Sequence, residues 1–169
     1  PFYKIYEGAA IASKAKIITL DLLEENDFLP VISDEVLKEC HLVILNFPNN
    51  PTCAMMSQEE LEKWVHKALK YDFVLINDEC YSEIYFDENK KPVSLLEASI
   101  SAGNKEFKNV LVLNSSSKRS SAPGLRNGFM AGDKDILKDY SLYRTYAGCV
   151  IPVPLQKAAT VAWNDEVHV

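Results

Sequence analysis

Apolar and polar residues alternate in blocks that predict strands and helices in turn. Unbroken apolar runs at residues 41–47, 73–76 and 110–113 have the length of buried strands. The β-branched run 16–20 and the glycine-flanked segment 126–132 predict two further strands. Helices are predicted at 2–13, 33–40, 93–101, 133–146 and 154–164, and from Ser57 onward.

The helix that begins after Ser57 has the strongest signal in the chain. Ser57 and Glu60 form a capping box, in which each side chain bonds a backbone amide of the first turn. Apolar residues then recur at the 3.6-residue spacing of one helix face, which predicts a buried stripe of Leu61, Trp64, Val65, Ala68 and Leu69.

Alternating helices and unbroken apolar strands predict an α/β fold with a mostly parallel open sheet and helices on both faces. The 169 residues contain no internal repeat or linker, so we expect one unit over residues 1–169. The chain starts at Pro1 without a Met, and we expect it to be part of a longer protein.

Composition narrows the functional classes. Lys plus Arg is 18 and Asp plus Glu is 24, a net charge of −6 that argues against nucleic-acid binding. No apolar run approaches the ~20 residues of a membrane span. Four scattered cysteines without a CxxC suggest a reducing cytoplasm and no metal site. The glycine fingerprints of common nucleotide-binding loops are absent from the sequence.

Polar side chains follow three of the predicted strands where each strand ends. In open α/β sheets, ligands bind at the carboxyl ends of the strands, so we expect these side chains to meet at one edge. They are Asn50 in P-N-N-P-T, Asp78 and Tyr81 in N-D-E-C-Y, Ser115, Ser117 and Lys118 in N-S-S-S-K, and Arg126 in P-G-L-R-N-G.

Together these groups suit pyridoxal 5′-phosphate. This cofactor needs a lysine amine for a Schiff base and a carboxylate that keeps its ring nitrogen protonated. Its phenolic oxygen needs donors, and its phosphate needs hydroxyls and a bidentate cation. The candidates are Lys118 for the amine, Asp78 for the carboxylate, Tyr81 and Asn50 for the phenolic oxygen, and Ser115, Ser117 and Arg126 for the phosphate.

The motifs N-P-T, D-x-x-Y and S-x-S-K…R occur in this order and resemble those in the large domain of fold-type I aminotransferases of class I/II. The resemblance covers nearly the whole chain. It departs from the family at Cys53 and Phe2, where glycine is more common. The resemblance implies a pyridoxal-phosphate enzyme that exchanges amino groups between amino acids and 2-oxo acids. By position, Lys118 resembles the Schiff-base lysine, which also moves the substrate proton. Asp78 resembles the partner of the ring nitrogen, and the other five residues keep the roles given above. Tyr3 in P-F-Y-K-I-Y resembles the aromatic that stacks on the cofactor ring.

Each assignment has a structural alternative. Asp78 could cap a helix, Asn50 could only shape its turn, and Arg126 could form a surface ion pair. Tyr81 could be packed in the core, and Tyr6 competes with Tyr3 for stacking. We interpret Glu79 as a structural or solvated acid, and the sequence assigns no chemistry to Trp163 or His168.

A narrower resemblance concerns S-K-R-S-S-A-P-G-L-R-N-G-F-M-A-G-D and A-W-N-D-E-V-H-V, which are similar to the succinyldiaminopimelate aminotransferases of bacterial lysine biosynthesis. It implies glutamate as amino donor and N-succinyl-2-amino-6-ketopimelate as acceptor. A carbon–sulfur lyase of the same fold and a non-catalytic cofactor-sensing regulatory domain stay open as alternatives.

The resemblance also implies that parts of the enzyme lie outside this chain. The family has a phosphate-binding helix before the region of Pro1 and a small domain after the region of Val169, and its members form homodimers. We therefore expect the 169-residue polypeptide alone to bind cofactor weakly and to be a poor transaminase.

Overall fold

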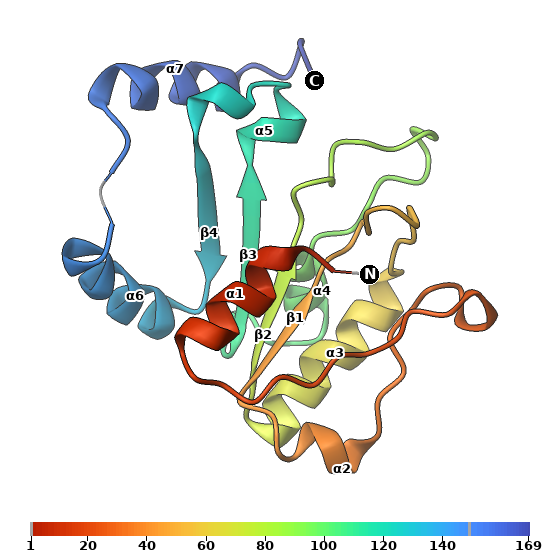
Figure 1. Cartoon of the computed structure of the whole chain (residues 1–169). Coiled ribbons are helices and arrows are strands. Elements are labelled where there is room, and N and C mark those ends of the chain that lie inside the picture. The colour runs from red at the N-terminus through yellow and green to blue at the C-terminus, as the bar shows by residue number, and fades with distance from the viewer. Residues whose placement is uncertain (1, 149) are drawn as a thin grey trace.

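The computed structural model describes residues 2–148 and 150–169. Its centre is one four-stranded sheet in the order β1-β2-β3-β4 (Figure 1). The strands run from Leu42 to Leu45 (β1), Val74 to Asp78 (β2), Val110 to Ser115 (β3) and Gly128 to Gly132 (β4).

Three of the four strands are parallel, which confirms the predicted mostly parallel sheet. Leu42 of β1 pairs with Val74, and Leu75 of β2 pairs with Val110. The exception is β4, which returns antiparallel to β3, so that Ser115 faces Gly128. Because β1, β2 and β3 point the same way, their carboxyl ends meet at one edge of the sheet.

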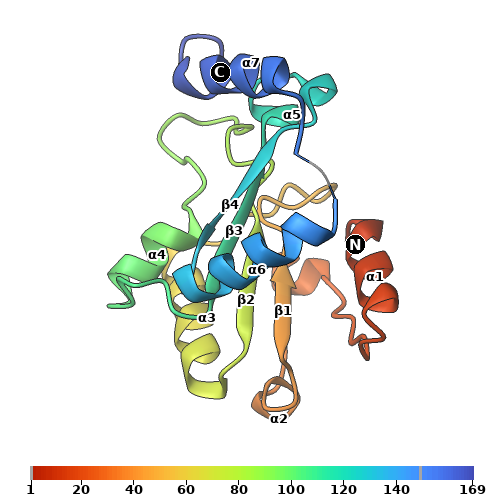
Figure 2. The ribbon, with the colours of Figure 1, turned by 90° about the vertical axis from the view of Figure 1, so that its left-hand side faces the viewer.

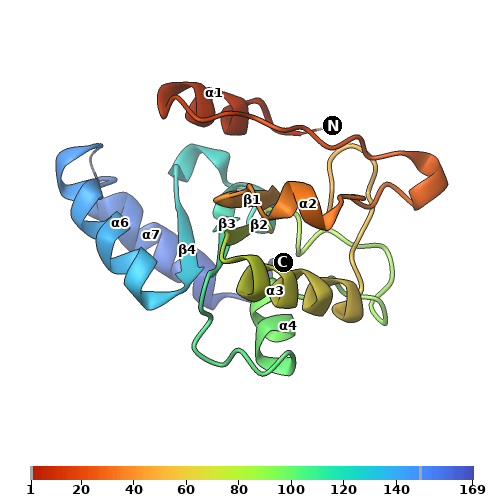
Figure 3. The same cartoon turned by 90° about the horizontal axis from the view of Figure 1, so that it is seen from below.

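Helices cover both faces, as predicted. α3 and α4 lie against one face, whereas α1 crosses the other face at the level of the strands (Figure 3). α6 lies beside β4, and α7 lies with α5 above the carboxyl end of β3 (Figure 2). The helices are α1 (Lys4–Ala12), α2 (Asp34–Leu37), α3 (Gln58–Tyr71), α4 (Leu95–Ser101), α5 (Ser116–Arg119), α6 (Lys134–Tyr146) and α7 (Val153–Asn164), with 3-10 turns η1 (Glu24–Asn26) and η2 (Pro123–Leu125). Among the described residues, no helix is both long and apolar enough to cross a bilayer.

Helix caps agree with the sequence pattern more closely than helix lengths do. The Ser57–Glu60 capping box forms, and Ser94 and Glu97 form a second one at α4. Ser33 caps α2 as predicted, but that helix ends at Leu37. In α3 the predicted stripe is buried except for Leu69, which is 37% exposed because it lies at the margin of the apolar face.

The strand predicted at residues 16–20 is wrong. This segment is extended, and in the described part of the chain no backbone hydrogen bond joins it to a strand. Ile17 and Ile18 are 42% and 45% exposed. β-branched residues favour an extended backbone, but a strand also requires a partner whose amides and carbonyls are available.

The core lies between the sheet and the helices α3 and α4. Phe73, Leu75, Val65, Leu95 and Val110 are fully buried there. This layer fixes the three parallel strands against one another and so fixes the relative positions of the loops that follow them.

A polar network lies buried directly beneath the end of β2. The Asn77 side chain donates to the Phe47 carbonyl (3.2 Å) and accepts from the Phe47 amide (3.1 Å). Glu79 is only 5% exposed and accepts hydrogen bonds from Asn77 (3.1 Å) and from the Leu95 amide at the start of α4 (2.7 Å). Since side chains alternate along a strand, Asn77 and Glu79 tie β2 to β1 and α4, and Asp78 between them is left to the opposite side.

Glu79 therefore gives a testable contribution to stability. Burial raises the pKa of Glu79, and the hydrogen bonds that it accepts offset only part of that effect. The folded chain holds the proton more tightly than the unfolded chain, so the free energy of unfolding falls as the pH rises from the unfolded pKa (about 4.3) through the folded one. We expect Glu79→Gln to flatten this part of the stability–pH curve, measured by urea unfolding.

The companion variant is Glu79→Leu. It leaves the buried Leu95 amide without an acceptor and removes one of the two acceptors of the Asn77 side chain, and we expect a loss of about 3 kcal/mol at neutral pH. Glu79→Gln keeps an acceptor oxygen and should stay within about 1 kcal/mol of the unsubstituted chain. Equal losses in both variants would contradict the role given to the hydrogen bonds.

Candidate functional site

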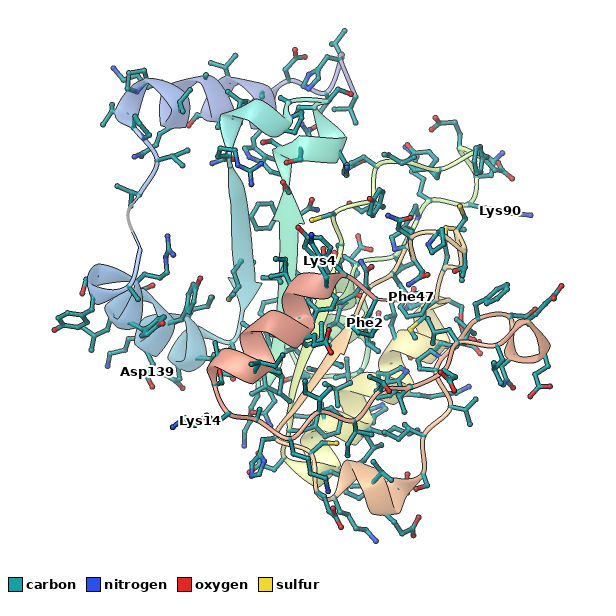
Figure 4. All side chains as sticks on the ribbon, viewed as in Figure 1. Phe2, Lys4, Lys14, Phe47, Lys90 and Asp139 are labelled. Atoms are coloured by element: carbon teal, nitrogen blue, oxygen red, sulfur yellow. The ribbon has the colours of Figure 1, made fainter. Side chains whose placement is uncertain are left out.

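Most of the predicted site residues lie at or after the carboxyl ends of the parallel strands, and Tyr3 lies just before α1, the helix that crosses one face of the sheet (Figure 1). The loop between β2 and α4 extends outward from the edge where the parallel strands end, and Figure 4 shows Lys90 on it with its side chain directed away from the sheet. The inner ends of the loops carry the groups described below.

Asn50, Tyr81 and Lys118 are brought together. The Asn50 amide donates to the Tyr81 hydroxyl across 3.1 Å, which joins the loop after β1 to the loop after β2. Lys118 Nζ lies 5.5 Å from the centroid of the Tyr81 ring. Tyr81 is half-buried and bonded through its hydroxyl, so the alternative of plain core packing does not describe it.

Asp78 ends β2, and its carboxylate accepts hydrogen bonds from one residue in α1 and one residue in its own loop. The Tyr6 hydroxyl donates to Asp78 Oδ2, and the Cys80 amide donates to Asp78 Oδ1 across 3.2 Å. No helix begins at Asp78, so the helix-cap alternative is wrong. Burial, followed by the hydrogen bond to Asp78, raises the pKa of Tyr6 well above its ordinary value, and Tyr6 is therefore a permanent donor to this carboxylate.

The Cys80 thiol lies in the same surroundings. Burial, with the hydrogen bond and negative charge of Asp78, raises its pKa to about 12, and the positive charge of Lys118 acts in the opposite direction. The thiol therefore stays protonated at neutral pH and is a weak nucleophile. Asp78 and Lys118 thus act on the same thiol in opposite directions.

Ser115 and Ser117 form a hydroxyl pair at the turn that leads to Lys118. Their Oγ atoms are 2.9 Å apart, and Ser115 Oγ also accepts from the Ser117 amide across 3.1 Å. Ser115 ends β3 and caps α5, the one-turn helix that contains Lys118. The segment between β3 and β4 therefore contains this helical turn and the 3-10 turn η2.

Tyr3 and Arg126 lie at the border of this group. The Tyr3 ring meets the Tyr6 ring edge to face at 5.8 Å, and its side chain is 55% exposed. Arg126 is exposed and donates to the Pro123 carbonyl across 2.9 Å, with a left-handed backbone (φ 51°) at the end of η2. Its contact is with its own loop and not the surface ion pair considered as an alternative.

Sequence reasoning missed two contributors. Tyr6 had entered only as a stacking alternative, yet it bonds Asp78. Trp163 had no assigned role, yet its indole donates to Asn127 next to the Lys118 turn. Neither contact has a sequence signal, because each joins segments more than ten residues apart. Glu79, interpreted as a structural or solvated acid, is a buried and hydrogen-bonded one.

The donor set fits pyridoxal phosphate. An amine, a carboxylate held by two donors, an amide–phenol pair and a hydroxyl pair all occupy one edge of the sheet. Each kind of group has a counterpart among the amine-binding, ring-nitrogen, phenolic and phosphate positions of that cofactor.

Comparisons with known proteins point the same way. The family model for class I and II aminotransferases matches residues 1–169. An LL-diaminopimelate aminotransferase of Maridesulfovibrio salexigens is 34% identical over 168 residues, which are 98% of this chain and 42% of that protein. The crystal structure of the aminotransferase AspB from Helicobacter pylori is 58% identical with a TM-score of 0.95, covering 99% of this chain and 44% of that one.

A third relative is a further solved structure. The probable N-succinyldiaminopimelate aminotransferase of Thermus thermophilus is 25% identical with a TM-score of 0.83, covering 96% of this chain and 42% of its own. The chain thus spans less than half the length of these relatives. The family model and the identities leave one assignment: the chain belongs to the class I and II aminotransferases.

Proposed function

We propose that residues 1–169 are the cofactor-binding part of a pyridoxal-phosphate aminotransferase. The observation that carries the proposal is the meeting of Asn50, Tyr81 and Lys118 at the edge of the sheet where β2 ends in Asp78. Class I and II aminotransferases depend on pyridoxal phosphate, and this edge holds each type of side chain that the cofactor needs.

The proposed roles follow from the chemistry of each group. Lys118 supplies the amine that bonds the cofactor and then carries the proton of the substrate carbon. Asp78 provides the negative charge that keeps the cofactor ring nitrogen protonated, and Tyr6 orients Asp78. Bound there, the cofactor supplies an electron sink for the bonds at the amino-acid α-carbon.

The other side chains bind and orient. Asn50 and Tyr81 donate toward the phenolic oxygen, with the Asn50–Tyr81 hydrogen bond setting their spacing. Ser115 and Ser117 direct two hydroxyls at the phosphate, and Arg126 supplies positive charge. Tyr3 covers the ring by stacking. These assignments are positions to test by single substitutions.

For the substrate, we propose an amino-acid/2-oxo-acid pair of the diaminopimelate branch of lysine biosynthesis. The names of two relatives, an LL-diaminopimelate and a probable N-succinyldiaminopimelate aminotransferase, support this choice. Glutamate is the proposed amino donor. The relatives are more than twice as long as this chain, so we place substrate recognition and dimer formation in a complete polypeptide.

The test uses the complete polypeptide that contains this chain. We expect amino transfer from glutamate that requires both pyridoxal phosphate and an oxo-acid acceptor, with N-succinyl-2-amino-6-ketopimelate compared against 2-oxo acids of other side chains. Release of ammonia and pyruvate without an acceptor would favour the carbon–sulfur lyase. Cofactor binding with neither reaction would favour the regulatory domain.

A further inference from the structure

Arg119 follows Lys118 directly and is a buried cation. Its side chain is only 4% exposed, and its guanidinium pairs with the Glu166 carboxylate. A second nitrogen donates to the Ala162 carbonyl across 2.9 Å. Charges are rarely buried without such compensation, so these contacts fix where the Arg119 backbone can lie.

The partners of Arg119 lie at the end of α7 or just after it, since Glu166 follows the last residue of the helix by two positions. Ala162 lies in the last turn of that helix, where carbonyls lack helical partners and the helix dipole is negative. The guanidinium carbon also lies 5.1 Å from the centroid of the Trp163 ring. Arg119 therefore caps α7 and stacks on it, although the two segments are more than forty residues apart in sequence.

A second connection runs from α7 to the other side of the lysine turn. The Trp163 indole donates to Asn127 Oδ1 across 2.6 Å, and its ring meets Phe129 at 5.1 Å. The Asn127 carbonyl in turn accepts from the hydroxyls of Ser115 and Ser116, each at 3.2 Å. It also accepts from the Ser116 amide at 3.2 Å.

The turn that carries Lys118 is thus held on both sides by contacts with α7. Arg119, the residue after Lys118, bonds α7 directly. Ser115 and Ser116, which precede Lys118, are connected to α7 through Asn127 and Trp163. Lys118 itself is exposed. A four-residue helix has little stability of its own. The backbone position of Lys118 therefore depends on the contacts that the neighbouring residues make with α7.

We propose that α7 locks the Lys118 turn in place, with Arg119 and Trp163 as positioning residues for the lysine amine. Neither residue touches the cofactor in this account. The effect on the lysine amine rests on the proposed function, but the stabilisation of the Lys118 turn by α7 can be measured without any cofactor.

The first experiment is hydrogen–deuterium exchange on the chain without cofactor. We expect Arg119→Met and Trp163→Phe each to raise exchange in residues 153–164 and also in residues 116–122. Arg119→Lys keeps the charge and should restore part of the protection. The matched control, Lys134→Met, removes an exposed pair with Glu106 (3.4 Å) and should leave both segments unchanged. Faster exchange confined to α7 would overturn the lock.

The second experiment uses the complete polypeptide with saturating pyridoxal phosphate. Condensation of the Lys118 amine with the cofactor aldehyde releases water, and borohydride adds hydride to the resulting C=N bond to leave a stable secondary amine. We expect the equilibrium ratio of bound cofactor attached to Lys118 over bound cofactor not attached to fall about tenfold in Arg119→Met, which corresponds to 1.4 kcal/mol. An unchanged ratio would overturn the positioning role.

The two experiments separate the two hypotheses. If the substitutions raise exchange in both segments but the unsubstituted protein forms no Lys118 adduct, the proposed function is wrong and the stabilisation of the turn by α7 is right. If the adduct forms normally but exchange rises only in α7, the stabilisation of the turn by α7 is wrong and the proposed function is unaffected.

Discussion

Lys118→Ala in the complete polypeptide is expected to lose amino transfer by about 10³-fold or more, because one substitution removes both the covalent attachment and the proton carrier. The same turn holds no second amine: the adjacent Arg119 carries a guanidinium, which is buried and paired with Glu166. Steady-state kinetics with glutamate and an oxo acid measure the effect.

Folding is the control for this loss. Lys118 is exposed, so its removal should change the free energy of unfolding by no more than about 0.5 kcal/mol. Lys118→Arg keeps the positive charge but cannot form the imine, and it should be as inactive as Lys118→Ala. Activity retained in either variant would contradict the assignment of Lys118.

Asp78→Asn is expected to produce the second large effect. The amide is nearly isosteric: its one oxygen can still accept from the Cys80 amide, and its NH2 group can donate to the Tyr6 hydroxyl in place of the present bond, so the main change is the loss of one negative charge. Removing a preorganised charge at a reacting centre lowers kcat by about 10²–10³-fold. We expect a loss of this size in kcat, with a smaller effect on cofactor affinity.

The charge of Asp78 also has a readout that needs no cofactor. Burial raises the pKa of Cys80 to about 12, and Asp78 contributes to that shift. In Asp78→Asn the Cys80 pKa should fall, so Cys80 should react faster with iodoacetamide above pH 8, followed by peptide mapping. The exposed Cys53 in the same protein serves as reference. An unchanged rate at Cys80 would mean that Asp78 is not its electrostatic neighbour.

The sheet could be predicted because its strands carry their own signal. The runs around Leu42–Leu45, Val74–Asp78 and Val110–Ser115 carry apolar residues on both faces, although in β1 and β2 fully buried residues alternate with less buried ones, and this leaves a continuous apolar pattern in the sequence. Residues 16–20 have a similar composition but form no strand, because pairing depends on a partner and not on propensity.

The site could be predicted where chemistry and strand ends coincide. Asn50, Asp78 and Lys118 each follow a strand, and parallel strands bring such residues to one edge. Tyr6 and Trp163 could not be found this way, since a tyrosine or tryptophan in a helix indicates packing as readily as hydrogen bonding. Their contacts with Asp78 and Asn127 depend on how α1 and α7 dock, which no local pattern encodes.

The central claim is that Lys118 is the cofactor lysine. Its most direct test is intact mass and peptide mapping of the 169-residue chain and of the complete polypeptide after pyridoxal phosphate and borohydride. We expect one reduced adduct, on the peptide containing Lys118, absent in Lys118→Ala, and stronger in the complete polypeptide than in the chain. A complete polypeptide that is not labelled at Lys118, or is labelled at another lysine, would contradict the account.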